Sequence, residues 1–376
     1  MLIDRRLALA LSLMVAVPAI ARGRKMAETP LYSAVAMQLA ARSVERASGR
    51  DEAMAQVRAQ LTEVEAQIRS ASIFIAQYSG SPVRLAVLPE YLFTSYPGRI
   101  SIPDFARLAA FDPDGPEYQL IGAMAERLQM YIAGNAYETD RHFPGLYFQA
   151  SFIAAPDGSI VLRYRRLNSM FAPTPHDVWD KYLDLYGLDG VFPVARTEIG
   201  NLSAIASEEI LYPEIARAHA LRGAEIFVHS SSEIGSPLAT PKAIARRARA
   251  FENLTYVISA NTAGIVNTAL PSASADGNSM IVDWKGNVIA ESNSGETFTA
   301  FADIDLAALR AARRKPGMTN MLARQRNALF APVYAADTHQ QANSLIVDGR
   351  VKTPDRDHFR HAMNSTIERL TKDGLI

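Results

Sequence analysis

The chain has 376 residues and contains no cysteine. Disulfide bonds, thiolate catalysis, cysteine-ligated zinc and iron–sulfur clusters are therefore excluded, because each of them requires a cysteine sulfur. The absence of cysteine indicates no cellular compartment, since such a chain suits oxidising and reducing surroundings equally.

The sequence also lacks an excess of charge of either sign, with 39 basic and 39 acidic residues. A general nucleic-acid-binding protein usually carries a basic excess or a basic stripe. Short clusters such as Arg246, Arg247 and Arg249 do not change this interpretation, so we expect no nucleic-acid partner. About half of the residues are apolar, which is enough to form a large core.

The N-terminal apolar run, residues 7–20, is shorter than the roughly 20 residues that a membrane-spanning helix needs. It follows Arg5 and Arg6 and ends in an A-x-A-like sequence, which is typical of an export signal. The paired arginines suggest twin-arginine export. We therefore expect residues 1–21 to be a signal, a periplasmic location, and no membrane span after signal removal. The alternative is a packed N-terminal helix in a cytoplasmic protein.

The chain shows no internal repeat and no low-complexity tract. Short runs rich in Val, Ile, Ala and Phe alternate with longer patterns of helical period, which predict strands and helices respectively. The predicted strands are 33–38, 84–88, 131–134, 151–155, 160–164, 202–206, 225–229, 256–260, 279–283, 288–290 and 298–304. The predicted helices are 51–77, 118–130, 213–222, 241–253, 306–313 and 357–370.

Turn sequences at 156–158 and 285–287 lie between predicted strands and indicate hairpins. Alternating strands and helices with interspersed hairpins indicate an α/β layered domain with mixed sheets. Residues 168–194 are polar, aromatic and irregular, which predicts a long functional loop over a pocket. A surface loop that packs on itself is the alternative.

A series of segments carries motifs in a consistent order: 34–38 (AVAMQ), 85–90 (LAVLPE), 154–166 (AAPDGSIVLRYRR), 205–217 (IASEEILYPEIAR), 222–225 (RGAE), 247–264 (RARAFENLTYVISANTAG), 277–283 and 302–306. Together they resemble the nitrilase superfamily of carbon–nitrogen hydrolases. The resemblance implies a four-layer α-β-β-α sandwich over residues 32–310, and a homodimer or higher homo-oligomer. We expect residues 311–376 to form a C-terminal extension that packs on the domain or on a partner subunit.

The resemblance assigns three chemical positions, normally a glutamate, a lysine and a cysteine. Glu90 matches the general base, and partial desolvation at the end of an apolar strand would raise its pKa; a salt-bridged glutamate is the alternative. Arg166 falls where the family has the lysine that stabilises the oxyanion. Its guanidinium keeps the charge but is planar and bulkier than an ammonium. A slip of one residue would place Arg165 there instead.

Ser207 falls where the family has its cysteine nucleophile. A serine hydroxyl needs a strong neighbouring base, and no sequence motif places a lysine or a histidine beside Ser207. This favours a small polar residue that merely fills the position. The backbone N–H of Glu208 follows a strand-to-helix turn and is expected to donate to an oxyanion or a carboxylate. Glu209 is expected to be structural.

Glu138 is the candidate for the second glutamate that many amidases of this family use, with an exposed loop carboxylate as the alternative. The seven histidines show no metal-binding signature, so we predict no metal and no organic cofactor.

Two functions from different classes remain open. The first is a hydrolase of carbon–nitrogen bonds other than peptide bonds, acting on small amide, carbamoyl or nitrile compounds. Ser207 would be its nucleophile, or water assisted by Glu90 would attack. The second is an inactive binding protein for a small amide or carboxylate, or a structural subunit.

Overall fold

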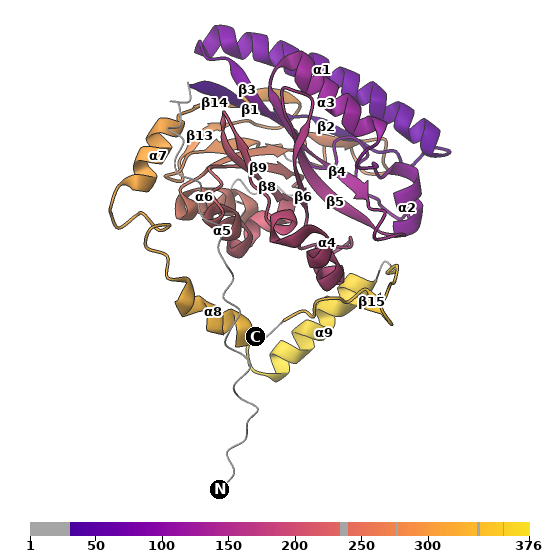
Figure 1. Ribbon diagram of the computed structural model, residues 1–376. Coiled ribbons are helices and arrows are strands. Elements are labelled where there is room, and N and C mark those ends of the chain that lie inside the picture. Colours follow the sequence, from indigo (N-terminus) through magenta and orange to yellow (C-terminus); the bar gives the residue numbers. More distant parts are fainter. Residues whose placement is uncertain (1–30, 234–239, 276, 337–338, 356) are drawn as a thin grey trace.

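Residues 31–233, 240–275, 277–336, 339–355 and 357–376 are described by the computed structural model (Figure 1). The predicted export signal at residues 1–21 lies outside the described residues.

The first of two large sheets contains six strands in the order β14-β1-β3-β4-β5-β6. Neighbours β1, β3 and β4 are parallel, whereas β14, β5 and β6 pair in antiparallel fashion. The strands are β1 (Tyr32–Gln38), β3 (Val83–Val87), β4 (Tyr131–Thr139), β5 (Tyr147–Ala154), β6 (Ile160–Arg165) and β14 (Thr297–Ile304).

The second sheet also has six strands, in the order β13-β12-β10-β9-β8-β7. Its centre is parallel and its outer strands are antiparallel. The strands are β7 (Ala195–Thr197), β8 (Gly200–Ala206), β9 (Ile226–Ser231), β10 (Tyr256–Asn261), β12 (Met280–Val282) and β13 (Val288–Glu291). Two short pairs complete the strands: β2 (Ala40–Arg42) with β11 (Gly264–Val266), and β15 (Ile346–Val347) with β16 (Arg350–Val351).

The two sheets pack against each other through one buried cluster. It includes Ala36 and Val87 from the first sheet and Ala204 and Ile258 from the second. Successive side chains of a strand point to opposite faces, so the alternate residues of these strands pack against the outer helices. Strands buried on both faces read as nearly continuous apolar runs, which is why the sequence identified them.

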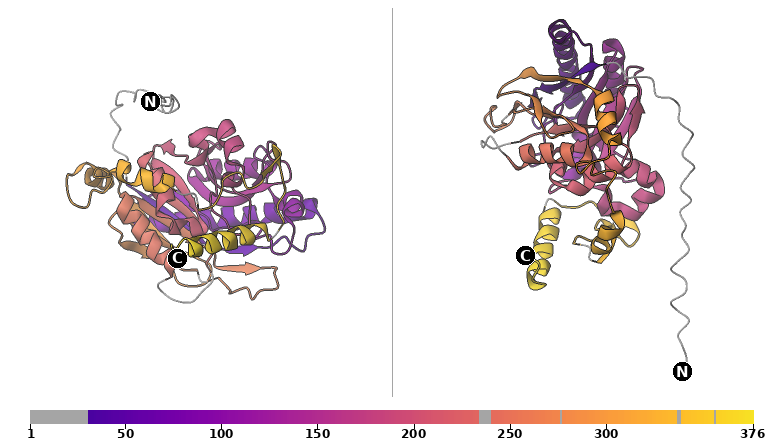
Figure 2. Two further views of the ribbon diagram at one scale, coloured as in Figure 1. Left: turned by 90° about the horizontal axis from the view of Figure 1, so that it is seen from below. Right: turned by 90° about the vertical axis from the view of Figure 1, so that its left-hand side faces the viewer.

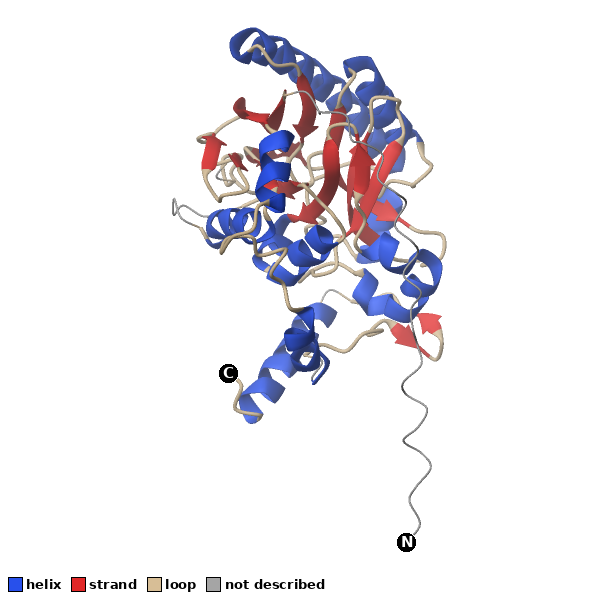
Figure 3. Ribbon diagram, turned by 60° about the vertical axis from the view of Figure 1, so that its left-hand side comes forward, coloured by secondary structure: helices blue, strands red, loops and turns tan. Residues whose placement is uncertain are grey.

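Helices cover the outer face of each sheet, so the layers run helix, sheet, sheet, helix (Figures 1 and 3). Helices α1 (Arg50–Ser79), α2 (Ile102–Ala109) and α3 (Pro116–Leu128) share a buried cluster with the first sheet. Helices α5 (Pro213–Leu221) and α6 (Pro241–Asn253) pack on the second sheet. The predicted four-layer α-β-β-α sandwich is confirmed.

The expectation that 168–194 is a loop throughout is wrong. A short 3-10 turn, η1 (Pro175–Val178), leads into helix α4 (Trp179–Val191). Gly187 has a left-handed φ of 58° and interrupts the helix, which breaks the helical periodicity in the sequence. Tyr182 anchors α4 in a buried aromatic cluster with Phe143 and Phe148.

The C-terminal segment contains α7 (Leu306–Arg314), α8 (Asn327–Ala336) and α9 (His358–Lys372). Figures 1 and 2 show α8 and α9 projecting from the layered body. No residue of α8 is buried, although the Tyr334 hydroxyl donates to a Glu214 carboxylate oxygen at 2.8 Å. The extension enters the apolar core at Phe359 of α9 and at Leu345, which is buried in the cluster around Tyr182.

Two searches of the described residues bear on function. None of the helices in those ranges is long and apolar enough to cross a membrane. The same residues contain no group of three or more His, Asp or Glu side chains that could hold a metal ion.

Candidate active site

Glu90 lies just beyond the carboxyl end of β3 and is fully buried. Its Oε1 accepts hydrogen bonds from Gln149 Nε2 at 2.7 Å and Arg166 Nη1 at 3.4 Å. Its Oε2 accepts from the backbone N–H of Ser232 at 3.0 Å and from the Ser232 hydroxyl at 2.8 Å. The carboxylate therefore joins residues of β5, the end of β6 and the segment after β9.

Arg166 occupies the position beside Glu90 that the resemblance gives to a lysine. Its Nη1 donates to Gln149 Oε1 at 2.6 Å, its Nε donates to the carbonyl of Asn168 at 2.6 Å, and its Nη2 pairs with Glu208. Burial works against the charge, but Glu208 and Glu90 raise the pKa of Arg166 above its ordinary value. Arg166 therefore stays charged, and it is an engaged donor rather than a free one.

Arg165 and Glu138 belong to a separate buried cluster. Arg165 donates to Glu138 Oε1 at 2.8 Å and pairs with Asp140. Glu138 also accepts from the Tyr118 hydroxyl at 3.0 Å and lies 3.3 Å from Arg163 Nε. Arg166 rather than Arg165 therefore stands beside Glu90. Glu138 is fully buried, so it is not an exposed loop carboxylate, and its contacts hold it with Arg165 rather than with Glu90.

Ser207 sits at the turn from β8 into the 3-10 turn η2 (Ser207–Leu211), with a left-handed φ of 49°. Such a conformation is unfavourable for a residue with a side chain, by about 1–3 kcal/mol, and it persists only where the surroundings impose it. A sharp strand-to-helix turn of this kind is typical of a nucleophile, and the Ser207 side chain is buried within the site. The predicted elbow is therefore present.

His229 fixes the backbone of the elbow through a hydrogen bond to Ser207. Burial lowers the pKa of His229 well below its ordinary value, so the ring is neutral. Its Nε2 lies 2.8 Å from the carbonyl oxygen of Ser207, which accepts only, so Nε2 carries the hydrogen. Nδ1 then accepts from the Ser259 hydroxyl at 2.8 Å. The backbone of Ser207 is thus fixed by a buried hydrogen-bond chain.

Glu209 ties the same elbow to the segment that carries Arg166. Its Oε1 accepts from the backbone N–H groups of Leu167 at 2.6 Å and Asn168 at 2.9 Å, and its Oε2 accepts from the Tyr164 hydroxyl at 2.7 Å. Burial raises the pKa of Glu209 to about 7, although Arg166 and these hydrogen-bond donors lower it. The contacts support the structural role expected for this residue.

Lys242 is a member of the site that sequence analysis missed. Its Nζ lies 3.2 Å from Ser207 Oγ and 3.0 Å from the carbonyl oxygen of Ser232. No sequence motif places a lysine beside Ser207, and the structure brings Lys242 there. The contact joins residues 35 positions apart and depends on how α6 docks on the second sheet. The available signal was the predicted helix start at 241, which places Lys242 in a first turn.

The amine of Lys242 lies inside the site, although the residue as a whole is only half-buried. Burial lowers the pKa of Lys242, Glu90 and Glu233 oppose that change, and Arg246 and Arg166 add to it. The net direction is downward, which increases the fraction of neutral amine near neutral pH.

A cavity of about 390 Å³ lies next to the site, between the segment after β6 and the C-terminal extension. Glu208 and Tyr212 border it on the side of the elbow, and His358 and Phe359 border it from α9. Residues 167–170, 174, 176 and 177 line it too, so the beginning of the predicted covering segment does face a cavity.

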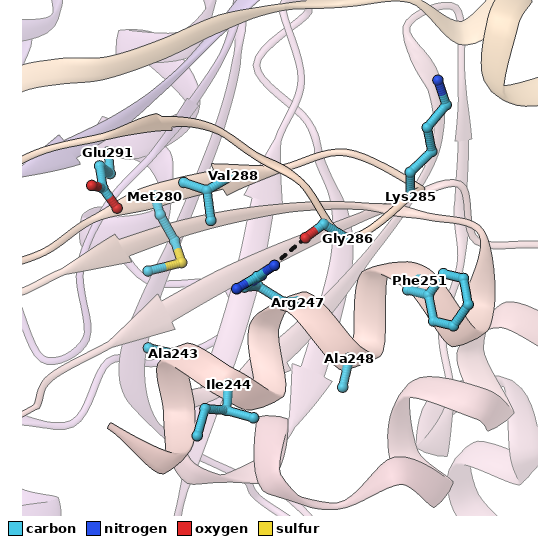
Figure 4. A pocket seen from close by; sticks show the side chains of 10 residues that line it. All are labelled: Ala243, Ile244, Arg247, Ala248, Phe251, Met280, Lys285, Gly286, Val288 and Glu291. Atoms are coloured by element: carbon cyan, nitrogen blue, oxygen red, sulfur yellow. Dashed lines mark hydrogen bonds between the residues drawn. The ribbon is translucent and has the colours of Figure 1, made fainter. Parts of the chain in front are cut away.

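A second cavity, of about 480 Å³, lies on another side of α6, toward the β12–β13 hairpin (Figure 4). Arg247 spans it and donates from Nε to the carbonyl of Gly286 at 3.0 Å. Lys285 extends from the hairpin there and is exposed. This groove has no residue in common with the surroundings of Ser207 described above.

Comparison with known proteins gives relatives over most of the chain. The chain is 22% identical to a probable nitrilase of Schizosaccharomyces pombe over 56% of its length and 74% of the relative's. It is 23% identical to an omega-amidase of Xenopus laevis over 66% of its length and 86% of the relative's.

Solved structures show the same fold. A carbon-nitrogen hydrolase from Helicobacter pylori aligns with a TM-score of 0.59 at 21% identity, over 82% of this chain and 99% of that one. An amidase from Nesterenkonia sp. aligns with a TM-score of 0.55 at 17% identity, over 82% and 99% respectively. The sequence profile of the family described as carbon-nitrogen hydrolase matches residues 53–314, which is more than half of the chain. The chain therefore belongs to the carbon-nitrogen hydrolase family of the nitrilase superfamily, as a member that lacks the catalytic cysteine.

Proposed function

We propose that this chain hydrolyses small carboxamides by transferring their acyl group to Ser207. One observation carries the proposal: Ser207 Oγ, held at a left-handed elbow, is bonded into the same buried network as Glu90 and Arg166. The connection runs from Ser207 Oγ to Lys242 Nζ, from Nζ to the Ser232 carbonyl, and from Ser232 to Glu90 Oε2. An inactive remnant would not need an imposed backbone conformation at this position.

Relatives support a carboxamide as the substrate. Several are named omega-amidases. Mutants of the Nesterenkonia amidase are solved in complex with butyramide and with acrylamide. We expect carboxamides to react before nitriles, because a serine hydroxyl is a weaker nucleophile than the thiolate that this chain lacks.

The groups around Ser207 stabilise the oxyanion and position the site. The Glu208 N–H is one of the first in η2 and has no partner within that turn, so it is the donor for the oxyanion. Arg166 adds positive charge next to it. Glu90 fixes Arg166 and Ser232, because its two oxygens already accept four hydrogen bonds.

The test is ammonia release from butyramide, acrylamide and butyronitrile by the native protein and by Ser207→Ala. We expect release from the amides, and a loss of about 1,000-fold or more in kcat for Ser207→Ala, because nucleophile removal leaves only residual catalysis. Ser159→Ala, in the β5–β6 hairpin where Ser159 bonds Asp157, is the matched control and should stay at the native rate.

The competing function makes the opposite prediction. If both the native protein and Ser207→Ala bind butyramide and neither releases ammonia, the chain is a binding protein and the proposal fails. Release that continues unchanged in Ser207→Ala would also contradict it, because water would then be the nucleophile.

Export and self-association complete the proposal. We propose that residues 1–21 are removed on export, and a mature N-terminus near Arg22 would support this. An intact Met1 in a cytosolic fraction would contradict it.

We also propose a homodimer, which light scattering of the purified protein tests directly. A monomer at micromolar concentration would contradict this proposal.

A further inference from the structure

We infer that Lys242, rather than Glu90, takes the proton from Ser207 Oγ, so that the two residues act as a serine–lysine pair. This inference rests on the proposed function. It replaces the general base that the sequence assigned with a residue from another element.

The geometry around the amine supports this role. Lys242 Nζ has two close polar neighbours, Ser207 Oγ at 3.2 Å and the Ser232 carbonyl oxygen at 3.0 Å. A neutral amine donates one hydrogen to the carbonyl, which accepts only, and this leaves its lone pair to accept the Ser207 hydroxyl proton. The Ser232 bond thus orients the amine, and the distance to Oγ lies at the outer limit of hydrogen-bond reach for a general base.

Glu90 is poorly placed for the same task. Both of its oxygens are occupied by donors, two from Ser232 and one each from Gln149 and Arg166. The bond that Ser207 Oγ makes is to Lys242. The four donors lie on both oxygens of the carboxylate, so Glu90 is engaged with Gln149, Arg166 and Ser232 rather than with Ser207.

Charges from several elements set the protonation of the amine. The ionisable groups that face Lys242 are Glu90 after β3, Arg166 after β6, Glu233 after β9, Arg246 on α6 and neutral His229 on β9. Two anions favour the ammonium, while two cations and burial favour the amine. Burial dominates, and the pKa of Lys242 falls below that of an exposed lysine.

The reaction balances with these two residues and water. Ser207 Oγ gives its proton to Lys242 Nζ and forms a bond to the amide carbon, and the carbonyl electrons move to the oxygen. When they return, the C–N bond breaks and Lys242 gives the proton to the leaving amine. Lys242 then takes a proton from water, which attacks the ester, and the released Ser207 Oγ recovers it. The products are a carboxylic acid and ammonia or an amine.

The exchange of residues across the site has a chemical reason. A cysteine forms a thiolate without a strong base, whereas a serine requires one. An arginine at 166 keeps a positive charge but does not give up its proton. This chain has a serine at the elbow, an arginine just after β6 and a lysine on α6. Lys242 can therefore serve as the base while Arg166 remains a permanent cation.

A fluorophosphonate tests the pair without a known substrate. It forms a phosphorus–oxygen bond with an activated serine and releases fluoride, while the serine proton passes to the base. The rate of the mass increase of the intact protein is measured for the native chain, Ser207→Ala, Lys242→Met and Lys242→Arg. We expect the native chain to be labelled at a measurable rate and Ser207→Ala not to be labelled. The labelling rate of both lysine variants should be about 100- to 10,000-fold lower than that of the native chain.

Two controls separate chemistry from folding. Lys242→Arg keeps a hydrogen-bond donor for the Ser232 carbonyl but cannot act as a base, so thermal unfolding near the native temperature with lost labelling is the expected pattern. Lys285→Met, at an exposed lysine on the β12–β13 hairpin, should label at the native rate. The native rate should also rise with pH to a plateau, with a midpoint below the ordinary lysine pKa.

The outcomes distinguish this inference from the proposed function. If Lys242→Arg labels at the native rate, or the native chain does not label, the serine–lysine pair is overturned. If amides are hydrolysed through Ser207 while Lys242→Arg remains active, the function stands and the pair fails. If labelling requires both residues and no amide is hydrolysed, the pair stands and the proposed substrate class fails.

Discussion

The two halves of the site differ in how completely their polar groups are paired. The half from the first sheet, Glu90 and Arg166, forms a closed network in which the carboxylate accepts four hydrogen bonds. The half from the second sheet places Ser207 against the amine of Lys242, which has one further acceptor, the carbonyl of Ser232. Charged groups whose hydrogen bonds are all satisfied keep the geometry of the site fixed. A hydroxyl and an amine with few partners remain able to exchange a proton. In the mechanism that we propose, the proton chemistry therefore belongs to the second half, and the first half positions it.

The largest expected effect tests whether the second half acts as a unit. Ser207→Ala should lower kcat for butyramide by about 1,000-fold or more, and Lys242→Met by about 100-fold or more. Residues that act together are not additive, so the double variant should lose no more than Ser207→Ala alone. Rates of ammonia release from the four proteins form the cycle. Additive losses would show that Lys242 acts separately from Ser207.

A smaller effect follows from the absence of cysteine. Ser207→Cys would carry the only thiol in the chain, so alkylation by iodoacetamide would report this position alone. Proton transfer from the thiol to Lys242 places an ammonium beside the thiolate, so the pKa of that thiol should lie below about 8.5, the ordinary value. We expect alkylation at pH 7 to be about tenfold faster than in the additional Lys242→Met variant, as a shift of one pKa unit implies. Equal rates would mean that Lys242 exerts no field on the elbow.

The smallest chemical effect is expected in the first half. Glu90→Gln removes one of the two carboxylates beside Arg166 and leaves Glu208 paired with it, so the free energy of unfolding should fall by about 1–3 kcal/mol in urea titrations. Glu90 raises the pKa of Lys242, so its loss should move the midpoint of fluorophosphonate labelling to lower pH. The labelling rate at the plateau should stay within about tenfold of the native rate, well short of the loss expected from removing a general base. Complete loss of labelling at every pH would show that Glu90 is the base, and the proton chemistry would then belong to the half of the site that contains Glu90 and Arg166.

The sequence predicted the fold well because its central strands are apolar on both faces. The predicted helix at 241–253 coincides with α6, and both hairpins at 156–158 and 285–287 lie where the turn residues indicated. The segment 168–194 was predicted wrongly, because Gly187 breaks the periodicity of α4.

The sequence locates part of the candidate site, for reasons that are also physical. Glu90, Arg166 and Ser207 follow strands, and strand ends can be located in a sequence. The contact of Lys242 with Ser207 arises only when α6 packs on the second sheet, so local periodicity carries no trace of it. The choice between Arg165 and Arg166 depended on the register of β6 against β5, which pairs Arg165 with Ala150.

The most direct measurement of the central claim is rapid acid quenching during butyramide hydrolysis, followed by peptide mass analysis. Activation of Ser207 by Lys242 predicts a butyryl ester on the peptide that contains Ser207 in the native protein, and none in Lys242→Arg. Ammonia release without any acylated peptide, or an equal amount of ester in Lys242→Arg, would contradict the claim.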